Sequence, residues 1–463
     1  MMERSFFFRY NHFMFSPFPE EKAKKEIDHV LELLKNGDLV LEKTGNVSLE
    51  RSENGLMLGC LVSHDKDGKI FVLRTLSGIS NRLVSKRKAG NSAFCENAET
   101  VFVEPLAGSE EIENALSEND REIHLLTEYL NKKKDTEMLE RRKKLCASSL
   151  EKVYALYSFY CFDGKKRSLM DLCKKRGLKG LPPTGTGDCC APKLLNYAFK
   201  NSLTIESMCE VFLGKGNKHK VNGFSYPPCD ERCGIILPSM LGLEILYRDK
   251  DILLVNKESG LLSVPGRGPE KSDCVEKRMK ILFPDTPSQP AVHRLDMETS
   301  GIMILAFNAE AHRKLVRQFE ERQVQKEYIA LVDGVLPAKK IPSHGQNELY
   351  FRLDIDNRPH QIWDEINGKK AVTEWDIVDV ENYLSPSGKV RPVTRVLFKP
   401  HTGRTHQLRL ASSDSHGFSC PIVGDTLYGK CEEGERLMLH AQRIVFFHPE
   451  DGRKMDFFCK APF

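Results

Sequence analysis

The alternation of apolar and polar residues predicts a β-hairpin in the first quarter of the chain. Residues 56–78, LMLGCLVSHDKDGKIFVLRTLSG, contain two apolar runs on either side of the polar segment HDKDG. Aspartate and glycine are favoured in the tight turns that join paired strands. We therefore expect a β-rich region over residues 1–107.

A helical pattern follows this region. Residues 110–159 contain no glycine or proline, and leucine and isoleucine recur at helical spacing. This predicts one long or two shorter helices over residues 108–160, an arrangement that a coiled coil would also fit. The charges there are mixed in sign, so we interpret the basic run at 131–144 as a solvated helix face in preference to an RNA contact.

The next region, residues 161–240, is rich in glycine, proline and cysteine, and we expect it to be irregular, with a helix starting after Pro192. The pair Gly185 and Gly187 lacks the third glycine of a dinucleotide-binding loop, and no Gly-Lys-Ser/Thr sequence follows. A nucleotide-binding fold and a nucleotide cofactor are therefore not expected.

Strand-like patterns dominate the last 221 residues, 243–463. Residues 301–308, GIMILAFN, predict a buried strand, residues 309–322 an amphipathic helix, and residues 326–334 a further strand. Other β-rich runs are KAVTEWDIVDV, VTRVLFKP and HAQRIVFFHP. Because strands outnumber helices, we expect an α+β domain with a mixed, mostly antiparallel sheet, preceded by an N-terminal extension of mixed helices and strands.

Length and composition narrow the class of protein. A chain of 463 residues predicts two or three domains, and a net charge of +4 permits a polyanionic partner without requiring one. No run of about 18 apolar residues is present, and the phenylalanine-rich N-terminus is interrupted by polar residues. We therefore expect a soluble cytoplasmic protein without a membrane contact, and a monomer as the simplest assembly.

The segment HRLDMETSG, residues 293–301, carries the main candidate for chemistry. It places Asp296 in a loop before a buried strand, with Arg294 two residues earlier. An aspartate in a loop is usually a turn or capping residue. Three further segments favour a catalytic role for Asp296 over a structural one, because a soluble domain has no structural need for them together. They are QKEY with Tyr328, TGRTHQLR with Arg404, and PIVGDTLYG. We interpret Asp425 in the last of these as a residue that closes a turn.

Together these segments resemble the RluA family of pseudouridine synthases, over residues 243–463. The resemblance also includes LEILYRDKDILLVNKESGLLSVPGR at the start and NRP at 357–359. It implies the pseudouridine-synthase fold and an isomerase that converts uridine into pseudouridine in the anticodon loop of tRNA, in large-subunit rRNA, or in both. Such a reaction adds and removes nothing overall, so it implies no redox cofactor, metal or ATP.

The resemblance also implies roles for individual residues. Asp296 would be the catalytic carboxylate, with Arg404 paired to it so that the carboxylate stays ionised. Tyr328 would stack on a uracil flipped out of the RNA, and Arg294 would fill the gap left in the RNA stack.

Two further residues, His406 and Arg409, are expected to contact RNA. We interpret both His293 and His406 as structural hydrogen-bonding residues in preference to acid–base catalysts. One departure from the family's pattern follows THQLR, where LASSDSHGFSCPI replaces the usual short helix and turn.

Four cysteines of the N-terminal half, Cys189, Cys190, Cys229 and Cys233, are candidates for a thiolate metal site, with His219 as an alternative ligand. The spacing of Cys229 and Cys233 suits a structural zinc pair, whereas the adjacent pair suits it less well. Ordinary buried cysteines are the competing interpretation. Two alternative functions stay open. The first is an inactive RNA-binding protein or RNA chaperone with a metal-binding N-terminal domain, and the second is a metal-dependent enzyme sited on these cysteines, with the C-terminal domain as a targeting module.

Overall fold

The structure is a computed structural model, and the chain divides into two compact units. The N-terminal unit comprises Asn11–Ile245 with Ile281–Pro284, and the C-terminal unit comprises Met1–Tyr10, Leu246–Lys280 and Asp285–Phe463. The structure describes residues 6–9, 16–43, 55–79, 81–85, 92–93, 97–178, 180–216, 220–229, 231–336 and 341–463.

The predicted hairpin lies at the centre of the N-terminal unit. Strands β3 (Leu56–His64) and β4 (Ile70–Leu76) pair antiparallel, which confirms the prediction, and Asp65 Oδ1 closes the turn by accepting from the backbone N–H groups of Asp67 and Lys69. The strand order is β6-β4-β3-β9, with β6 at Glu99–Phe102 and β9 at Thr204–Leu213. A separate pair joins β2 (Leu39–Lys43) and β5 (Asn81–Ser85).

Helices cover both faces of this small sheet because its central strand is apolar on both sides. Helix α1 (Glu21–Asn36) packs its buried residues against one face, in a core that includes Leu58 and Val62 of β3. Helix α5 (Cys190–Lys200) covers the other face. There Gly59 lies so close to Cys190 that an added Cβ would come within 2.4 Å of the Cys190 Cβ.

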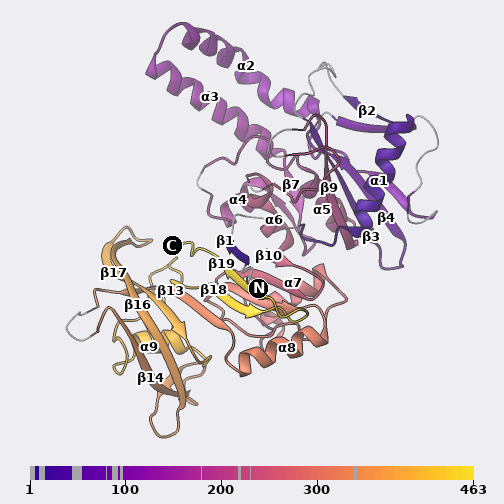
Figure 1. The fold of residues 1–463 in the computed structure, drawn as a ribbon. Coiled ribbons are helices and arrows are strands. Elements are labelled where there is room, and N and C mark those ends of the chain that lie inside the picture. Colours follow the sequence, from indigo (N-terminus) through magenta and orange to yellow (C-terminus); the bar gives the residue numbers. More distant parts are fainter. Residues whose placement is uncertain are drawn as a thin grey trace. The chain divides into compact units, whose positions relative to one another are not determined.

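The helical region forms two helices, the shorter-helix version of the prediction. Helix α2 (Ser109–Lys132) and helix α3 (Thr136–Ala155) lie side by side, as Figure 1 shows. Asp135 ends the connection and caps α3 by accepting from the backbone N–H of Met138 at 3.1 Å. The remaining elements of the unit are β7 (Ser158–Tyr160), β8 (Lys166–Ser168), α4 (Leu169–Lys175) and α6 (Cys233–Leu241).

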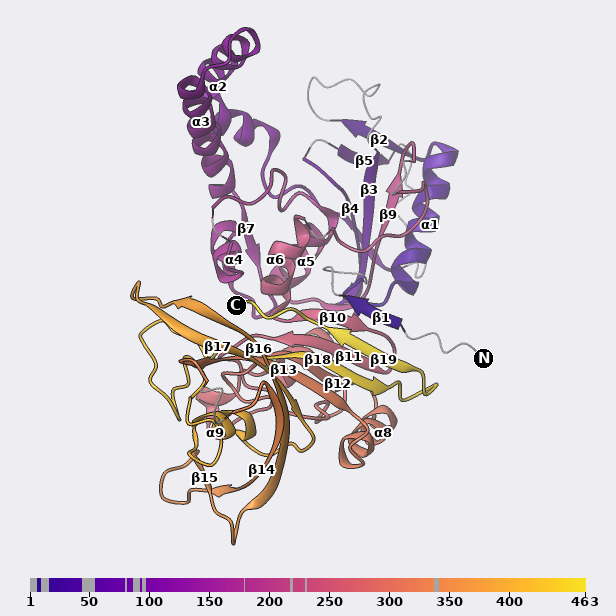
Figure 2. The same cartoon turned by 60° about the vertical axis from the view of Figure 1, so that its left-hand side comes forward.

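The C-terminal unit is built on one large sheet, which confirms the expected α+β class. Its strand order is β10-β11-β12-β18-β13-β17-β16-β14-β15, with β19 beside β18 and β1 beside β19. Figure 2 shows β14 and β15 toward one end and β12 and β19 toward the other. The strands are β1 (Phe6–Arg9), β10 (Glu244–Arg248), β11 (Ile252–Lys257), β12 (Ser300–Ala306), β13 (Gln325–Asp333), β14 (His344–Leu353), β15 (Gln361–Trp363), β16 (Lys369–Leu384), β17 (Val390–Pro400), β18 (Leu439–Phe447) and β19 (Lys454–Phe458).

Most pairings in this sheet are antiparallel, and parallel pairs join β12 to β18 and β1 to β19. The predicted buried strand is β12, in which every residue is buried. The predicted amphipathic helix is α8 (Ala309–Glu320), which contacts β12 and β18. The other helices are α7 (Val275–Leu282) and α9 (Gln407–Ser413).

Two expectations about helices were wrong. Helix α5 begins at Cys190, before Pro192, because proline is tolerated in the first turn, where its missing N–H has no helical partner. The segment after THQLR was expected to lack the family's short helix, but α9 forms there and ends at Ser413. None of the helices in the described part of the chain combines the length and the apolar character that a membrane crossing requires.

Candidate active site

The loop that carries Asp296 is held in place by side chains from the end of β11 and from the turn that follows it. The Lys257 ammonium is buried and donates hydrogen bonds to three backbone carbonyls, including that of Met297 at 2.9 Å. Ser263 Oγ donates to the carbonyl of Leu295 at 2.6 Å and accepts from its N–H at 3.0 Å. The backbone on both sides of Asp296 is therefore held in place.

A glycine at the end of the loop allows the following strand to enter the sheet. Gly301 has a φ of +123° and lies opposite Ala441 in the pairing of β12 with β18. An added Cβ at this position would come within 2.4 Å of the Ala441 carbonyl oxygen. Only glycine fits such a close backbone approach, and it sets the position of the loop against the sheet.

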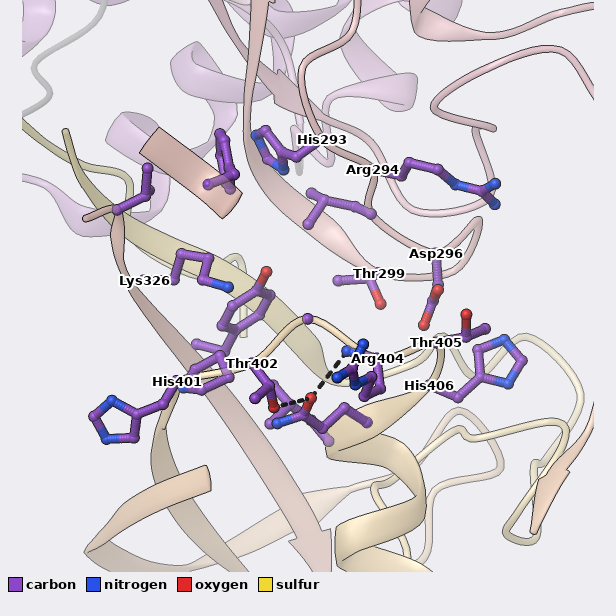
Figure 3. Close-up of a pocket in the computed structure, with 18 of the residues that line it drawn as sticks. His293, Arg294, Asp296, Thr299, Lys326, His401, Thr402, Arg404, Thr405 and His406 are labelled. Atoms are coloured by element: carbon purple, nitrogen blue, oxygen red, sulfur yellow. Dashed lines mark hydrogen bonds between the residues drawn. The ribbon is translucent and has the colours of Figure 1, made fainter. Parts of the chain in front are cut away.

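The three residues expected to carry the reaction line one cavity. Its volume is about 570 Å³, and Asp296, Tyr328 and Arg404 reach it from the loop before β12, from β13 and from the loop after β17. Figure 3 shows Asp296 and Lys326 on different sides of this cavity, with Thr299 between them. Other lining residues include Arg294, Phe319, His401, Thr405, His406 and Arg409.

The carboxylate of Asp296 is half-buried and, among the described residues, has no hydrogen-bond or ion-pair partner. The expected pairing with Arg404 is not present in this structure, which holds no RNA, and it stays a prediction. The Arg404 side chain is exposed, and its Nε donates to the backbone carbonyl of Lys370 at 3.0 Å. Its backbone N–H donates to Gln407 Oε1 at 3.0 Å, which fixes the loop and leaves the end of the guanidinium available.

Tyr328 lies on β13 at a point where the pairing with β18 shifts register, between Glu327 and Tyr328. The ring is half-buried, and the hydroxyl has no hydrogen-bond partner among the residues that the structure describes. Burial, with a smaller contribution from the Asp296 charge, raises the pKa of the Tyr328 phenol. The hydroxyl is therefore protonated at neutral pH and open to a ligand in the cavity.

Comparisons with known proteins agree on one family. The family described as RNA pseudouridylate synthase matches residues 251–414. The dual-specificity RNA pseudouridine synthase RluA of Yersinia pestis is 43% identical over 222 residues, which are 47% of this chain and 99% of that protein. RluA of Escherichia coli K12 is 41% identical over 224 residues, or 48% of this chain and 94% of that protein.

The chain belongs to the RluA family of pseudouridine synthases. It is an isomerase that acts on RNA, as expected from its motifs. Among solved structures, human RNA pseudouridylate synthase domain containing 1 is 30% identical with a TM-score of 0.39, and the match covers 48% of this chain and 84% of that chain. About half of the chain lies outside these matches.

In this RluA-family enzyme Arg409 is committed to a buried ion pair, which corrects its expected contact with RNA. Its side chain is 3% exposed, and its guanidinium donates to both oxygens of the fully buried Asp425, at 2.6 and 2.8 Å. It also donates to Glu298 of the Asp296 loop at 2.8 Å. Asp425 accepts from the backbone N–H of Leu427 as well, which confirms that it closes a turn.

The two histidines of the site have structural partners. His293 Nε2 accepts from the backbone N–H of Ile304 at 3.0 Å, and burial lowers the pKa of His293 to about 3. His406 is buried with its Nδ1 2.8 Å from the Tyr428 hydroxyl, and burial lowers the pKa of His406 too. These contacts agree with the structural interpretation, while an RNA contact by His406 stays a prediction.

Sequence reasoning missed two lysines. Lys326 lines the cavity, and burial lowers its pKa. Its place beside Tyr328 in QKEY was a usable signal, because residues two apart on a strand point to the same face. Lys257 fastens the Asp296 loop, and burial lowers its pKa to about 7. Nothing in VNKESG distinguishes it from an exposed lysine.

The cysteine candidates separate into two groups in the N-terminal unit. The sulfurs of Cys189, Cys229 and Cys233 all lie within 4.8 Å of one another. Cys190 is not part of this group, because its thiol is buried and donates to the backbone carbonyl of Met57 at 3.3 Å. The alternative ligand, His219, lies outside the described residues.

Proposed function

We propose that this enzyme isomerises a uridine in a structured RNA loop, in the anticodon loop of tRNA, in large-subunit rRNA, or in both. Its relatives in Yersinia pestis and Escherichia coli are dual-specificity RNA pseudouridine synthases, which supports a choice of more than one RNA. In the reaction the N1–C1′ bond breaks and C5 bonds to C1′. The proton that leaves C5 is balanced by one gained at N1, so no other reactant is needed.

Asp296 is the carboxylate that acts on the nucleotide. The observation that carries this proposal is a half-buried carboxylate facing a cavity, without a partner among the described residues, on a loop whose backbone is fastened by Lys257 and Ser263. A structural aspartate would have its oxygens occupied, as those of Asp425 are. A carboxylate that is held but unpaired is suited to act as a nucleophile or base.

The target uridine enters the cavity after it is flipped out of the RNA. Flipping costs a few kcal/mol of unstacking, which contacts in the pocket must offset. Tyr328 provides a ring for stacking and an unpaired hydroxyl that can reach the base. Arg294, whose side chain is exposed at the cavity, occupies the space that the base leaves.

Arg404 orients Asp296 once RNA is bound. In the described structure its guanidinium makes a single hydrogen bond, to the Lys370 carbonyl. Turning the guanidinium toward Asp296 therefore costs one hydrogen bond. A planar guanidinium can hold a carboxylate through two parallel hydrogen bonds. Together with Arg294 and Lys326 it also gives the cavity wall a positive charge, which favours the RNA backbone.

The proposal is tested with purified protein and two unmodified RNAs, a tRNA anticodon stem-loop and a fragment of large-subunit rRNA. Pseudouridine is mapped after incubation without added metal or cofactor. Asp296→Asn keeps the shape of the side chain and removes its charge. Asp285→Asn makes the same change at an exposed position away from the cavity and serves as the matched control.

Wild type and Asp285→Asn should form pseudouridine at the same rate in at least one RNA. Asp296→Asn should be slower by about 10³-fold or more while it still binds that RNA. Product from Asp296→Asn at the wild-type rate would remove Asp296 from the mechanism. RNA binding by the wild type without product in either RNA would contradict the proposed substrates.

A further inference from the structure

Three thiols of the N-terminal unit have the arrangement of metal ligands. Cys189 precedes helix α5, Cys233 is the first residue of helix α6, and Cys229 lies four residues before Cys233. The three sulfurs come from segments 40 residues apart in the chain, yet all lie within 4.8 Å of one another. The fold of the unit therefore brings them together, and chain proximity alone does not explain it.

The distances suit a tetrahedral ion better than a disulfide. The sulfurs of Cys189 and Cys229 are 3.7 Å apart, and all three cysteines are free thiols. A disulfide requires about 2.05 Å between its sulfurs. Zinc binds thiolate at about 2.3 Å, and two corners of a tetrahedron with that bond length are separated by about 3.8 Å.

We propose that Cys189, Cys229 and Cys233 bind a divalent zinc-like ion through three thiolates. Among the described residues, no fourth histidine, cysteine, aspartate or glutamate joins this cluster, and the remaining tetrahedral position is left to a donor outside this set, for example a water molecule. The inference concerns the N-terminal unit and does not depend on the proposed function of the C-terminal unit.

The surroundings of the cluster suit such an ion. Three thiolates and a divalent cation carry a net charge of −1, which needs a nearby positive group in a partly buried site. The Lys193 ammonium, on α5, is 1% exposed and interacts electrostatically with Cys189. Two helix N-termini also meet at the cluster, and their positive dipole ends favour thiolates.

Only part of the cluster is accessible, which matters for its exchange of metal. Cys233 is buried, Cys189 is half-buried and Cys229 is exposed. An ion could therefore enter beside Cys229 without unfolding of the unit. The exposed position also makes Cys229 the residue whose replacement is least disruptive to packing.

The test measures metal in the full-length protein, purified without a metal-affinity step. Elemental analysis should find about one zinc per chain. Cobalt reconstitution should give thiolate-to-cobalt charge-transfer absorption and the visible bands of a tetrahedral ion. X-ray absorption should find three sulfur ligands at about 2.3 Å and one lighter atom at about 2.0–2.1 Å.

Variants then assign the ligands. Cys229→Ser should weaken metal binding by more than about 100-fold, because loss of a direct ligand exceeds the 10- to 100-fold effect of an outer-shell change. Cys146→Ser, on α3, removes a thiol outside the cluster and should bind as wild type does. Cys190→Ser tests the adjacent thiol, which should also be dispensable for metal.

Three results would overturn the proposal. Wild type could contain no metal and show no cobalt–thiolate absorption, Cys229→Ser could bind cobalt as tightly as Cys146→Ser, or thiol counting could reveal a disulfide between Cys189 and Cys229. The first and third are measured on the wild type, so they stand even if a variant does not fold. Pseudouridine formation should not change when the metal is removed, which separates this test from that of the proposed function.

Discussion

Two loop aspartates of the C-terminal unit, Asp296 and Asp425, differ in burial and in the number of their hydrogen-bond partners. Asp425 is fully buried, and its oxygens accept from Arg409 and from the backbone of its own turn. Asp296 is half-buried at a cavity and has no side-chain partner among the described residues. An aspartate with every oxygen occupied stabilises a fold, whereas one held by its backbone with its oxygens free is available to a substrate.

The two aspartates are also connected. Arg409 joins Asp425 to Glu298, two residues after Asp296 in the same loop. Thr426 Oγ1 donates to Glu298 as well, at 2.7 Å. The buried aspartate therefore helps to hold the loop on which the open aspartate stands, and we regard Arg409 and Asp425 as positioning residues.

The largest expected effect on stability comes from Asp425→Asn. Removal of the Asp425 charge from a buried ion pair leaves Arg409 with the partly exposed Glu298 as its one carboxylate partner among the described residues, which costs up to about 3–5 kcal/mol. Glu381→Gln is the control, because it breaks the more exposed pair with Arg395 and should cost at most about 1 kcal/mol. Chemical denaturation measures both variants, and equal losses would contradict the distinction.

Arg404→Lys should affect the rate next. Lysine keeps the charge but cannot hold Asp296 or a phosphate through two parallel hydrogen bonds. We expect single-turnover pseudouridine formation to slow by about 10- to 100-fold, with a smaller change in RNA affinity. Arg313→Lys, on the exposed face of α8, should leave the rate unchanged. A wild-type rate for Arg404→Lys would show that Arg404 does not orient the carboxylate.

Two substitutions at Tyr328 separate its ring from its hydroxyl. Tyr328→Leu removes stacking, which is worth about 1–3 kcal/mol per base, so RNA affinity should fall by about 10-fold. Tyr328→Phe keeps the ring and should bind RNA as wild type does, with a lower rate if the hydroxyl takes part in proton removal. Fluorescence binding and single-turnover rates distinguish the two. Equal RNA affinity in both variants would argue against stacking.

The most gradual expected effect is a pH dependence of stability from His293. Burial lowers its pKa to about 3, below the usual value of about 6.5. Between these values the unfolded chain binds a proton that the folded chain does not, so this contribution to stability is complete above about pH 6.5 and is lost as pH falls. The loss is roughly 1 kcal/mol per pH unit.

Denaturation of His293→Gln at several pH values checks this contribution. The stability difference between wild type and His293→Gln should shrink as pH falls from about 6.5 to about 4. His344→Gln, at an exposed position of β14, should differ from wild type by the same amount throughout. A difference for His293→Gln that stays constant over this range would contradict the buried, neutral histidine.

Periodicity predicted the elements whose pattern is local. A pattern contained within about 20 residues was enough to predict each of these elements: the hairpin of β3 and β4, the buried strand β12 and helix α8. The start of α5 was misplaced because Pro192 was taken as a boundary, although proline fits a first helical turn.

The burial and the ion-pair partners of the charged side chains could not be predicted from local sequence patterns. Arg409, part of the TGRTHQLR motif, was expected to contact RNA. Its burial depends on Asp425, 16 residues away, and on Glu298, 111 residues away. Arg404 shows the opposite case, since motif resemblance implied a pair with Asp296 that the structure does not contain. Such ion pairs form between loops that are far apart in the chain, so they cannot be predicted from the sequence of any single segment.

The most direct test of the contrast compares Asp296→Asn with Asp425→Asn in the same two assays, single-turnover pseudouridine formation and chemical denaturation. Asp296→Asn should lose about 10³-fold or more in rate and change stability by no more than about 0.5 kcal/mol. Asp425→Asn should lose up to about 3–5 kcal/mol of stability and retain a measurable rate while folded. An active Asp296→Asn, or an Asp425→Asn variant that is as stable as wild type, would contradict the account.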